Sequence, residues 1–257
     1  MILRRVIAHF RKQEWTAIAI DFVIVVVGVF VGLQVSNWNA ARADQMRARA
    51  YLERISADLG ADLDTYQDRL HFWGDVAAYG AKGLAYAETG EAGGDTQWDL
   101  LLAYFQASQV AEFFTTSATY EELKSAGELG LIANTKLRDA LAQYYSLGVN
   151  PALTERPAYR EHVRGVVPLG VQSYIWGACY ASDAQARQAM LACKSPLNET
   201  AAAAIVDAIR SNAALMSELR YWMSTMHVAS LIGRDRIESA TSLRRAVDSE
   251  LGVGPPN

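Results

Sequence analysis

The first pattern in the chain is an apolar run from Thr16 to Val35, interrupted by a single carboxylate, Asp21. A bilayer core about 30 Å thick needs roughly 20 helical residues, so the run is just long enough to cross one. Trp15 and Trp38 flank it, where indole rings favour the membrane interface. A cleaved signal peptide would have a shorter apolar stretch with small residues close behind it, and a buried core helix is the other alternative. The pattern favours an uncleaved transmembrane helix over residues 16–38.

Beyond this run, apolar residues recur at steps of three and four, which places them on one side of a helix. Two long stripes follow this rule: Leu52, Ile55, Leu59, Leu63, Tyr66, Leu70 and Trp73, and then Val206, Ile209, Ala213, Met216, Leu219, Met223 and Met226. No glycine or proline lies between Trp38 and Leu52, so the transmembrane helix is predicted to run directly into the first stripe. The last long helix is predicted to open at 196–198, with Gly233 as a candidate break.

Shorter helices are predicted between the two long ones. A glycine-rich break at 90–95 is followed by a helix with Asp95 or Thr96 as its N-cap, the next helix begins at Ser117 or Thr119 and stops at Gly127, and another has Asn134 as its N-cap. A helical stretch interrupted by prolines follows over 155–180, and a short amphipathic piece over 183–193. The expected fold is therefore all-α, an antiparallel bundle with long first and last helices and short helices between. The expected divisions are a cytoplasmic basic N-terminus (1–15), the transmembrane helix (16–38), one extracytoplasmic helical domain (39–251) and a polar tail (252–257).

Charge bears on orientation and on partners. The net charge is −4, so no general field attracts nucleic acid, and no nucleic-acid partner is expected. Four basic residues, Arg4, Arg5, Arg11 and Lys12, precede the apolar run, and short basic flanks tend to stay in the cytoplasm. The far flank is basic too, which weakens this signal. The sequence favours a cytoplasmic N-terminus and a periplasmic domain on a bacterial inner membrane.

The chain has two cysteines, Cys179 and Cys193, which enclose a short polar loop. A disulfide closing about 15 residues would stabilise by roughly 3 kcal/mol in an oxidising compartment. Two unrelated buried thiols are the alternative. No Cys-x-x-Cys motif or Cys/His group suggests a metal, and neither a metal nor a cofactor is expected.

Three segments resemble a family of uncharacterised bacterial proteins with an N-terminal membrane helix and a helical domain. The matching segments are Val23 to Asn39, Tyr51 to Leu63, and Thr119 to Tyr145. The resemblance covers the first 145 residues well and the remainder loosely. It implies a bacterial origin and this architecture, and it carries no catalytic residue with it.

Asp21, Gly28 and Gly32 are the candidate contact residues of the membrane helix. A carboxylate within an apolar helix is costly and often marks an ion path or a partner contact, although Asp21 is close enough to the basic end to reach the headgroups. Gly28 and Gly32 form a Gly-x-x-x-Gly face that lets helices approach closely, a pattern that also arises by chance. Asp21 lies seven residues before Gly28, so all three share a face. The predicted partners are the lipid bilayer and a second copy or another membrane protein.

Tyr120, Glu121, Tyr144 and Tyr145 are candidates for a ligand pocket on the short central helices, with Trp176 as a further aromatic. Aromatic residues at helical spacing are more often core, and Glu121 beside Glu122 suits the first turn of a helix. The four histidines are isolated, and no nucleophile or phosphate-loop motif is present, so no catalytic residue is assigned. The sequence favours a non-enzymatic membrane-tethered module that binds a ligand or partner. The alternatives are a membrane-anchored enzyme with a site on the central helices, and a subunit similar to the stators of proton-driven motors that uses Asp21.

Overall fold

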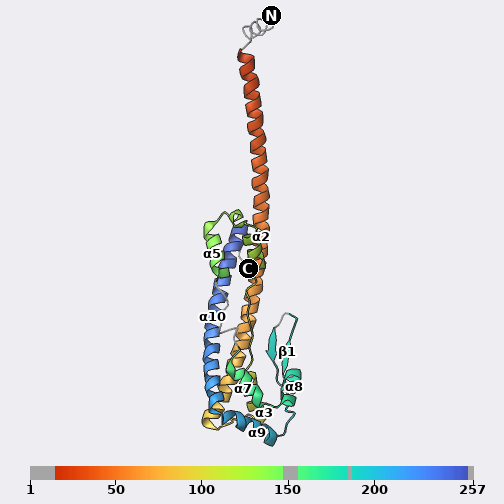
Figure 1. Ribbon diagram of the computed structural model, residues 1–257, viewed down its shortest axis with the longest axis vertical. Helices are drawn as coiled ribbons and strands as arrows, with labels where there is room; N and C mark the ends of the chain where they lie inside the picture. Colours follow the sequence, from red (N-terminus) through yellow and green to blue (C-terminus); the bar gives the residue numbers. More distant parts are fainter. Residues whose placement is uncertain (1–14, 147–155, 185–186, 254–257) are drawn as a thin grey trace. The chain divides into compact units, whose positions relative to one another are not determined.

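The computed structural model describes residues 15–146, 156–184 and 187–253, and the chain divides into two units, Met1–Tyr51 and Leu52–Asn257. The described elements are α2 (Trp15–Thr89), α3 (Gln97–Gln106), α4 (Ala118–Ser125), the 3-10 turn η1 (Leu129–Leu131), α5 (Thr135–Ser146), α7 (Ala158–Val166), α8 (Leu169–Ala178), β1 (Tyr180–Ser182), β2 (Gln188–Met190), α9 (Glu199–Arg210) and α10 (Ala213–Leu251) (Figure 1). The all-α prediction is confirmed, with long first and last helices.

In the first unit, the large apolar side chains of α2 are not buried against any other part of the described chain. Its large side chains are half to two-thirds exposed, including Phe22 at 68% and Val25 at 63%. From Ala19 onward α2 is long and apolar enough to cross a membrane. The predicted flank Trp38 is 63% exposed, with the Arg42 guanidinium 5.8 Å from its ring centroid.

In the second unit, the buried side of α2 repeats every seven residues. Apart from Phe72, its buried positions as far as Gly83 alternate steps of three and four: Leu52, Ile55, Leu59, Asp62, Tyr66, Arg69, Trp73, Val76, Gly80 and Gly83. A step pattern averaging 3.5 keeps one seam of a helix against a partner helix. That partner is α10, whose seam follows the same rule, with one gap between Gly233 and Ala240, through Leu219, Trp222, Met226, Ala229, Gly233, Ala240, Leu243 and Val247.

The two long helices of the domain run antiparallel, as predicted (Figure 1). Ser56 Oγ donates to Asp248 Oδ1 (2.6 Å) near one end of the pair. Toward the other end, a side chain at Gly80 would collide with Met223. The residue numbers therefore rise along one helix as they fall along the other.

Several helix ends lie where the capping residues predict them. Thr96 and Asp99 form a capping box for α3, and the Asn134 Oδ1 accepts from Leu137 N (3.2 Å). Gly127, with φ of 71°, follows α4 and takes the left-handed conformation that glycine tolerates best. Local polar chemistry thus sets these boundaries.

The C-terminal helical pattern was wrong in two respects. A single helix from 198 was expected, but α9 ends at Arg210, and Asn212 caps a separate helix by accepting from Ala214 N and Leu215 N. Gly233, expected as a break, lies inside α10 and faces Leu70 and Trp73 of α2. A glycine at that position lets the two helices approach closely.

The amphipathic piece expected over 183–193 is instead part of a small hairpin. Strands β1 and β2 pair antiparallel, with Tyr180 opposite Met190 and Ser182 opposite Gln188. The structure joins Cys179 to Cys193, with Cα atoms 5.2 Å apart, as predicted. This disulfide encloses the hairpin. Strands of three residues are too short to show an alternating pattern, so no sequence pattern indicated these two.

Candidate functional site

The predicted pocket tyrosines converge in the structure. The rings of Tyr120 and Tyr145 stack with centroids 4.5 Å apart, and Tyr144 meets Tyr145 edge-on at 5.0 Å. The Tyr144 hydroxyl donates to Asp62 Oδ2 (2.7 Å), a carboxylate that is 1% exposed. Helices α2, α4 and α5 therefore each contribute a side chain to one tyrosine cluster, which comprises Tyr120, Tyr144, Tyr145 and Asp62.

Glu121 does not belong to this cluster. It is exposed, and the Lys124 ammonium lies 3.5 Å from its carboxylate one turn along α4. Its neighbour Glu122 pairs with Arg54 of α2. Both glutamates are thus on the solvent side of the helix, as expected for charged residues in a first turn.

Asp62 is the member of the cluster that the sequence reasoning missed. It also accepts from the backbone N–H of Thr116 through Oδ1 (2.8 Å), so each of its carboxylate oxygens has a donor. The signal for it lay in the stripe itself, because position 62 continues the alternating steps from Ile55 and Leu59 to Tyr66. A charged residue on an apolar seam indicates a buried polar contact.

Burial raises the pKa values of three tyrosines in this region. Burial, with Asp62 nearby, raises the pKa of Tyr66 to about 12 and raises those of Tyr144 and Tyr145 further. The Tyr145 hydroxyl and Asp58 Oδ2 are buried, and no described residue lies within hydrogen-bonding distance of either. The cluster is equipped to donate hydrogen bonds rather than to abstract protons.

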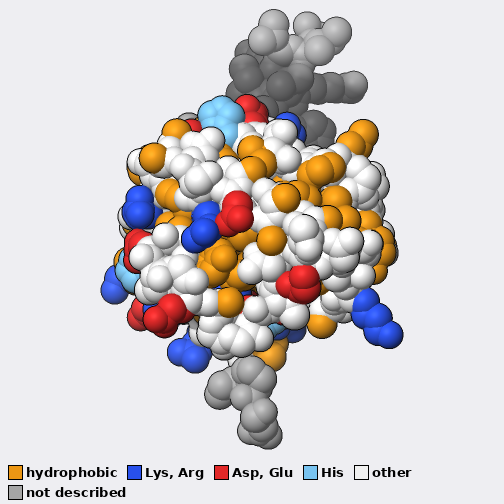
Figure 2. Space-filling view, turned by 90° about the horizontal axis from the view of Figure 1, so that it is seen from below, with side chains coloured by type: hydrophobic (Ala, Val, Ile, Leu, Met, Phe, Trp, Pro, Cys, Tyr) orange, Lys and Arg blue, Asp and Glu red, His pale blue; other side chains and the backbone are white. Residues whose placement is uncertain are grey.

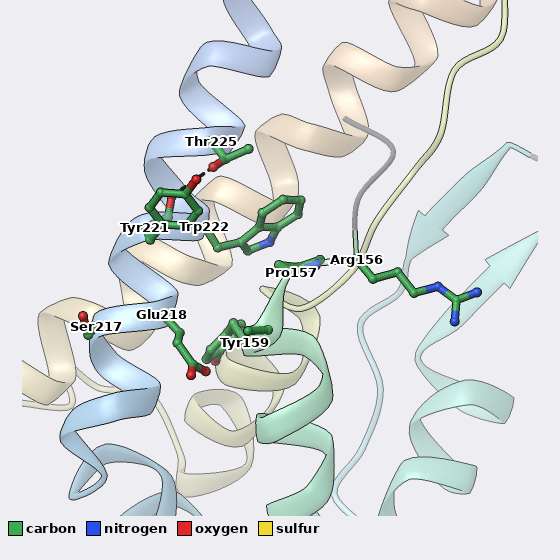
Figure 3. A pocket seen from close by; sticks show the side chains of 9 residues that line it. Arg156, Pro157, Tyr159, Ser217, Glu218, Tyr221, Trp222 and Thr225 are labelled. Carbon is green, nitrogen blue, oxygen red and sulfur yellow. Dashed lines mark hydrogen bonds between the residues drawn. The ribbon is translucent and has the colours of Figure 1, made fainter. Parts of the chain in front are cut away.

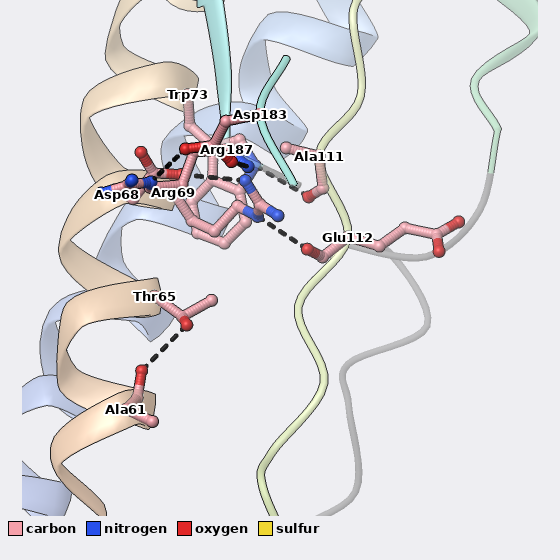
Figure 4. Close-up of polar contacts among 9 residues, drawn as sticks. All are labelled: Ala61, Thr65, Asp68, Arg69, Trp73, Ala111, Glu112, Asp183 and Arg187. Carbon is pink, nitrogen blue, oxygen red and sulfur yellow. Dashed lines mark hydrogen bonds and ion pairs between the residues drawn. The ribbon is translucent and has the colours of Figure 1, made fainter. Parts of the chain in front are cut away.

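A non-helical strap, residues 107–117, connects α3 to the cluster and runs along α2. Trp73 Nε1 donates to Ala111 O (3.2 Å), and Arg69 Nε donates to Glu112 O (2.7 Å) (Figure 4). Further along, the Tyr66 ring stacks on Phe113 with centroids 3.6 Å apart. The polar residues on the α2 seam therefore satisfy backbone groups of a segment that has no secondary structure of its own.

A cleft of about 400 Å³ lies between the start of α7 and α10. Tyr159, Glu218, Tyr221 and Trp222 line it, and Figure 3 shows Arg156 extending away from the α10 side chains. Glu218 is engaged by His162, whose Nδ1 lies 2.9 Å from Oε1. The Tyr221 side chain is 76% exposed, so the cleft offers an aromatic wall with one carboxylate that already has a partner.

The surface at the lower end of the helical domain is mixed in charge. Figure 2 shows acidic and basic side chains interspersed there, with hydrophobic side chains in a hollow between them. Within the described residues, no group of three or more His, Cys, Asp or Glu side chains is placed to hold a metal ion. This end of the molecule therefore presents no large field of one sign.

The membrane-helix candidates have no neighbours within the described chain. A Cβ atom added to Gly28 or Gly32 would meet no atom within 4 Å, and Asp21 is exposed. The three residues share one face of the helix, as their spacing requires. Their predicted contact with another helix stays a prediction.

No family model matches the chain, and no curated protein or solved structure is similar to it.

Proposed function

We propose that the chain is a single-pass membrane protein whose helical domain binds a ligand or partner outside the cytoplasm. The observation that carries this proposal is the exposed apolar part of α2. Side chains such as Phe22, Ile24 and Val25 are more than 60% exposed, and burying such side chains is worth roughly 1.5–3 kcal/mol each. Only an apolar environment relieves that exposure, and the stretch has the length of a bilayer core.

Binding, rather than catalysis, is supported by how the polar groups are used. Asp62 is fully occupied by Tyr144 and Thr116, and Glu218 is occupied by His162. The cleft between α7 and α10 combines the aromatic surfaces of Tyr159, Tyr221 and Trp222 with polar side chains such as Arg156, Glu218 and Thr225, and both kinds of group serve in ligand sites. We take this cleft and its surroundings as the binding region.

The proposed orientation places the N-terminus in the cytoplasm of a bacterial cell and the domain in the periplasm. Its support is the basic segment before the membrane helix and the joined pair Cys179–Cys193, since disulfides persist in oxidising compartments.

Fractionation of cells expressing the full chain tests the membrane assignment. The parent should resist alkaline extraction and dissolve in detergent. Replacing Val26 and Val29 by arginine should release it, because each charge near a helix centre costs about 2.5–3.5 kcal/mol of insertion. Ala57→Arg, an exposed position of α2 in the helical domain, is the control and should remain in the membrane. A parent chain that is released by alkali would refute the proposal.

Reporter fusions after Asn257 test the orientation. A phosphatase, which needs export, should be active there, and a cytoplasm-dependent fluorescent protein should be dark. The opposite pair of results would overturn the periplasmic placement.

A further inference from the structure

Two arginines of α7, Arg160 and Arg164, lie one turn apart and both contact Ser108 and Gln109 of the strap. Arg160 Nη1 donates to Ser108 O (2.7 Å) and approaches Gln109 Oε1 (3.4 Å). Arg164 donates through Nε to Ser108 Oγ (3.1 Å) and through Nη2 to Gln109 Oε1 (3.1 Å). All of these acceptors are neutral, so they orient the guanidinium groups without balancing their charge.

The guanidinium of Arg164 is also held by aromatic rings. It lies 5.0 Å from the ring centroid of Phe105 and 4.9 Å from that of Trp176. Trp176 in turn meets Tyr180 edge-on at 4.8 Å, at the start of the hairpin. Two aromatic rings and two hydrogen bonds thus hold the guanidinium group in place, which favours recognition of an oxyanion.

No ion pair joins Arg160 or Arg164 to a carboxylate in the parts of the chain that the structure describes. The acidic groups of the facing elements have other partners, since Asp68 pairs with Arg69 and Asp183 with Arg187. Arg156, four residues before Arg160, adds a third cation that acts on it.

Burial and the neighbouring cations both disfavour the charged forms of the two arginines and lower their pKa values. Burial, together with the neighbouring Arg160, lowers the pKa of Arg164 to about 9. Burial and Arg156 also lower the pKa of Arg160. Taking a charge out of water is costly unless it is compensated, and no carboxylate among the described residues forms an ion pair with Arg156, Arg160 or Arg164.

We propose that Arg156, Arg160 and Arg164 form a site for a tetrahedral oxyanion, the phosphate group of a small dissolved ligand. Arg160 Nε and Nη2 and Arg164 Nη1 have no acceptor among the described residues, and they supply donors for its oxygens. A doubly charged tetrahedral anion fits three cations better than a planar carboxylate with one charge. Arg160 and Arg164 face the strap and α3 and do not line the cleft between α7 and α10, so this inference goes beyond the binding region proposed above.

Calorimetric titration of the full chain in an uncharged detergent tests the site, with inorganic phosphate as the probe and chloride used to hold the ionic strength constant. Phosphate and sulfate should each bind at one site per chain, and acetate should bind more weakly. Arg160→Gln and Arg164→Gln should each weaken phosphate binding about tenfold or more, because each removes charge-assisted hydrogen bonds. Phosphate that produces no more heat than chloride, or acetate that binds as tightly as phosphate, would overturn the assignment.

Three further variants distinguish the loss of the phosphate site from the loss of the folded structure. Arg156→Gln changes an exposed side chain, so the protein should fold normally and bind phosphate several-fold more weakly. Gln109→Glu places a carboxylate where both guanidinium groups already find an acceptor, and it should abolish phosphate binding by supplying the anion internally. Arg220→Gln, which removes an exposed ion pair to Glu88, should bind like the parent. If Arg156→Gln and Gln109→Glu both bind like the parent, the site is wrong.

The two proposals can fail separately. A chain that stays in the membrane but ignores phosphate refutes the oxyanion site alone. A chain that binds phosphate but is released by alkali refutes the membrane assignment alone.

Discussion

At the scale of single residues, the buried polar groups on the seam of α2 distinguish this structure from a simple apolar bundle. The sequence pattern chose Leu63 and Leu70 for that seam, but Asp62 and Arg69 are the more deeply buried residues, at 1% and 6% exposed. Hydrophobicity alone would place the leucines on the buried seam. Asp62 and Arg69 are buried there instead because they form hydrogen bonds with the strap, residues 107–117, and Asp62 also with Tyr144. Those partners are distant in sequence, so single-sequence reasoning could predict the stripe and the tyrosines but not what joins them.

Tyr144→Phe should destabilise the domain by about 1–3 kcal/mol, because it leaves Asp62 Oδ2 buried without its donor. The free energy of unfolding in denaturant, followed by circular dichroism, measures this loss. Tyr120→Phe is the matched control, since its ring stacks on Tyr145 and the phenyl ring preserves that contact. Equal effects of the two substitutions would contradict the role assigned to the hydrogen bond.

The stability of the protein should fall in alkali partly through Tyr66. Its pKa is raised by burial from 10.0 to about 12 in the folded protein, so its contribution is fully present below pH 10 and is lost as the pH rises through about 12. Tyr66→Phe should therefore flatten the decline of the unfolding free energy in this window. A decline as steep as that of the parent would show that Tyr66 does not contribute to it.

At the scale of elements, the sequence predicted the helices with clear caps and missed features that depend on tertiary contact. Thr96 and Asn134 cap helices as expected, because their hydrogen bonds are local. The hairpin depends on the pairing of β1 with β2 and on the cysteines, and the place of Gly233 inside α10 depends on α2. The break between α9 and α10 could have been predicted from the sequence, because Asn212 is a strong N-cap residue.

Two glycines of α2 should respond in opposite ways to alanine. At Gly83 a Cβ atom would lie 2.9 Å from the buried ring of Tyr104, so Gly83→Ala should destabilise by about 1–3 kcal/mol. At Gly74 no atom lies within 4 Å, so Gly74→Ala should stabilise by about 0.5–1 kcal/mol through the helix propensity of alanine. Thermal unfolding midpoints of the two variants compare them, and shifts of the same sign would contradict the packing described for Tyr104.

Loss of the disulfide should cost about 3 kcal/mol, the entropy of closing a loop of roughly 15 residues. The double variant Cys179→Ser with Cys193→Ser measures this by its unfolding midpoint in denaturant. Adding a reducing agent to the parent should reproduce the shift and leave the variant unchanged. Two alkylatable thiols in the non-reduced native protein would show that the bond does not form in the cell.

At the scale of the whole molecule, the candidate membrane helix is the part whose apolar side chains do not pack against other described residues. The face with Asp21, Gly28 and Gly32 is open in the structure, and the contact that we propose for it is with lipid or another helix. We expect replacement of Gly28 and Gly32 by isoleucine to weaken self-association or partner association in a membrane two-hybrid or crosslinking assay. Asp21→Asn should perturb it less. If the double isoleucine variant associates and functions like the parent, this face contacts only lipid.

The antiparallel pairing of α2 with α10 also sets an order of events during synthesis. Ser56 and Asp248, which share a hydrogen bond, are 192 residues apart, so the first helix of the domain leaves the ribosome long before its partner exists. Until then its apolar seam is open to the surroundings, including chaperones and other nascent chains. Chains truncated before residue 213 never acquire α10, and we expect them to be degraded or to aggregate. The helical domain therefore cannot complete its packing until the 39 residues of α10 have been made, long after α2.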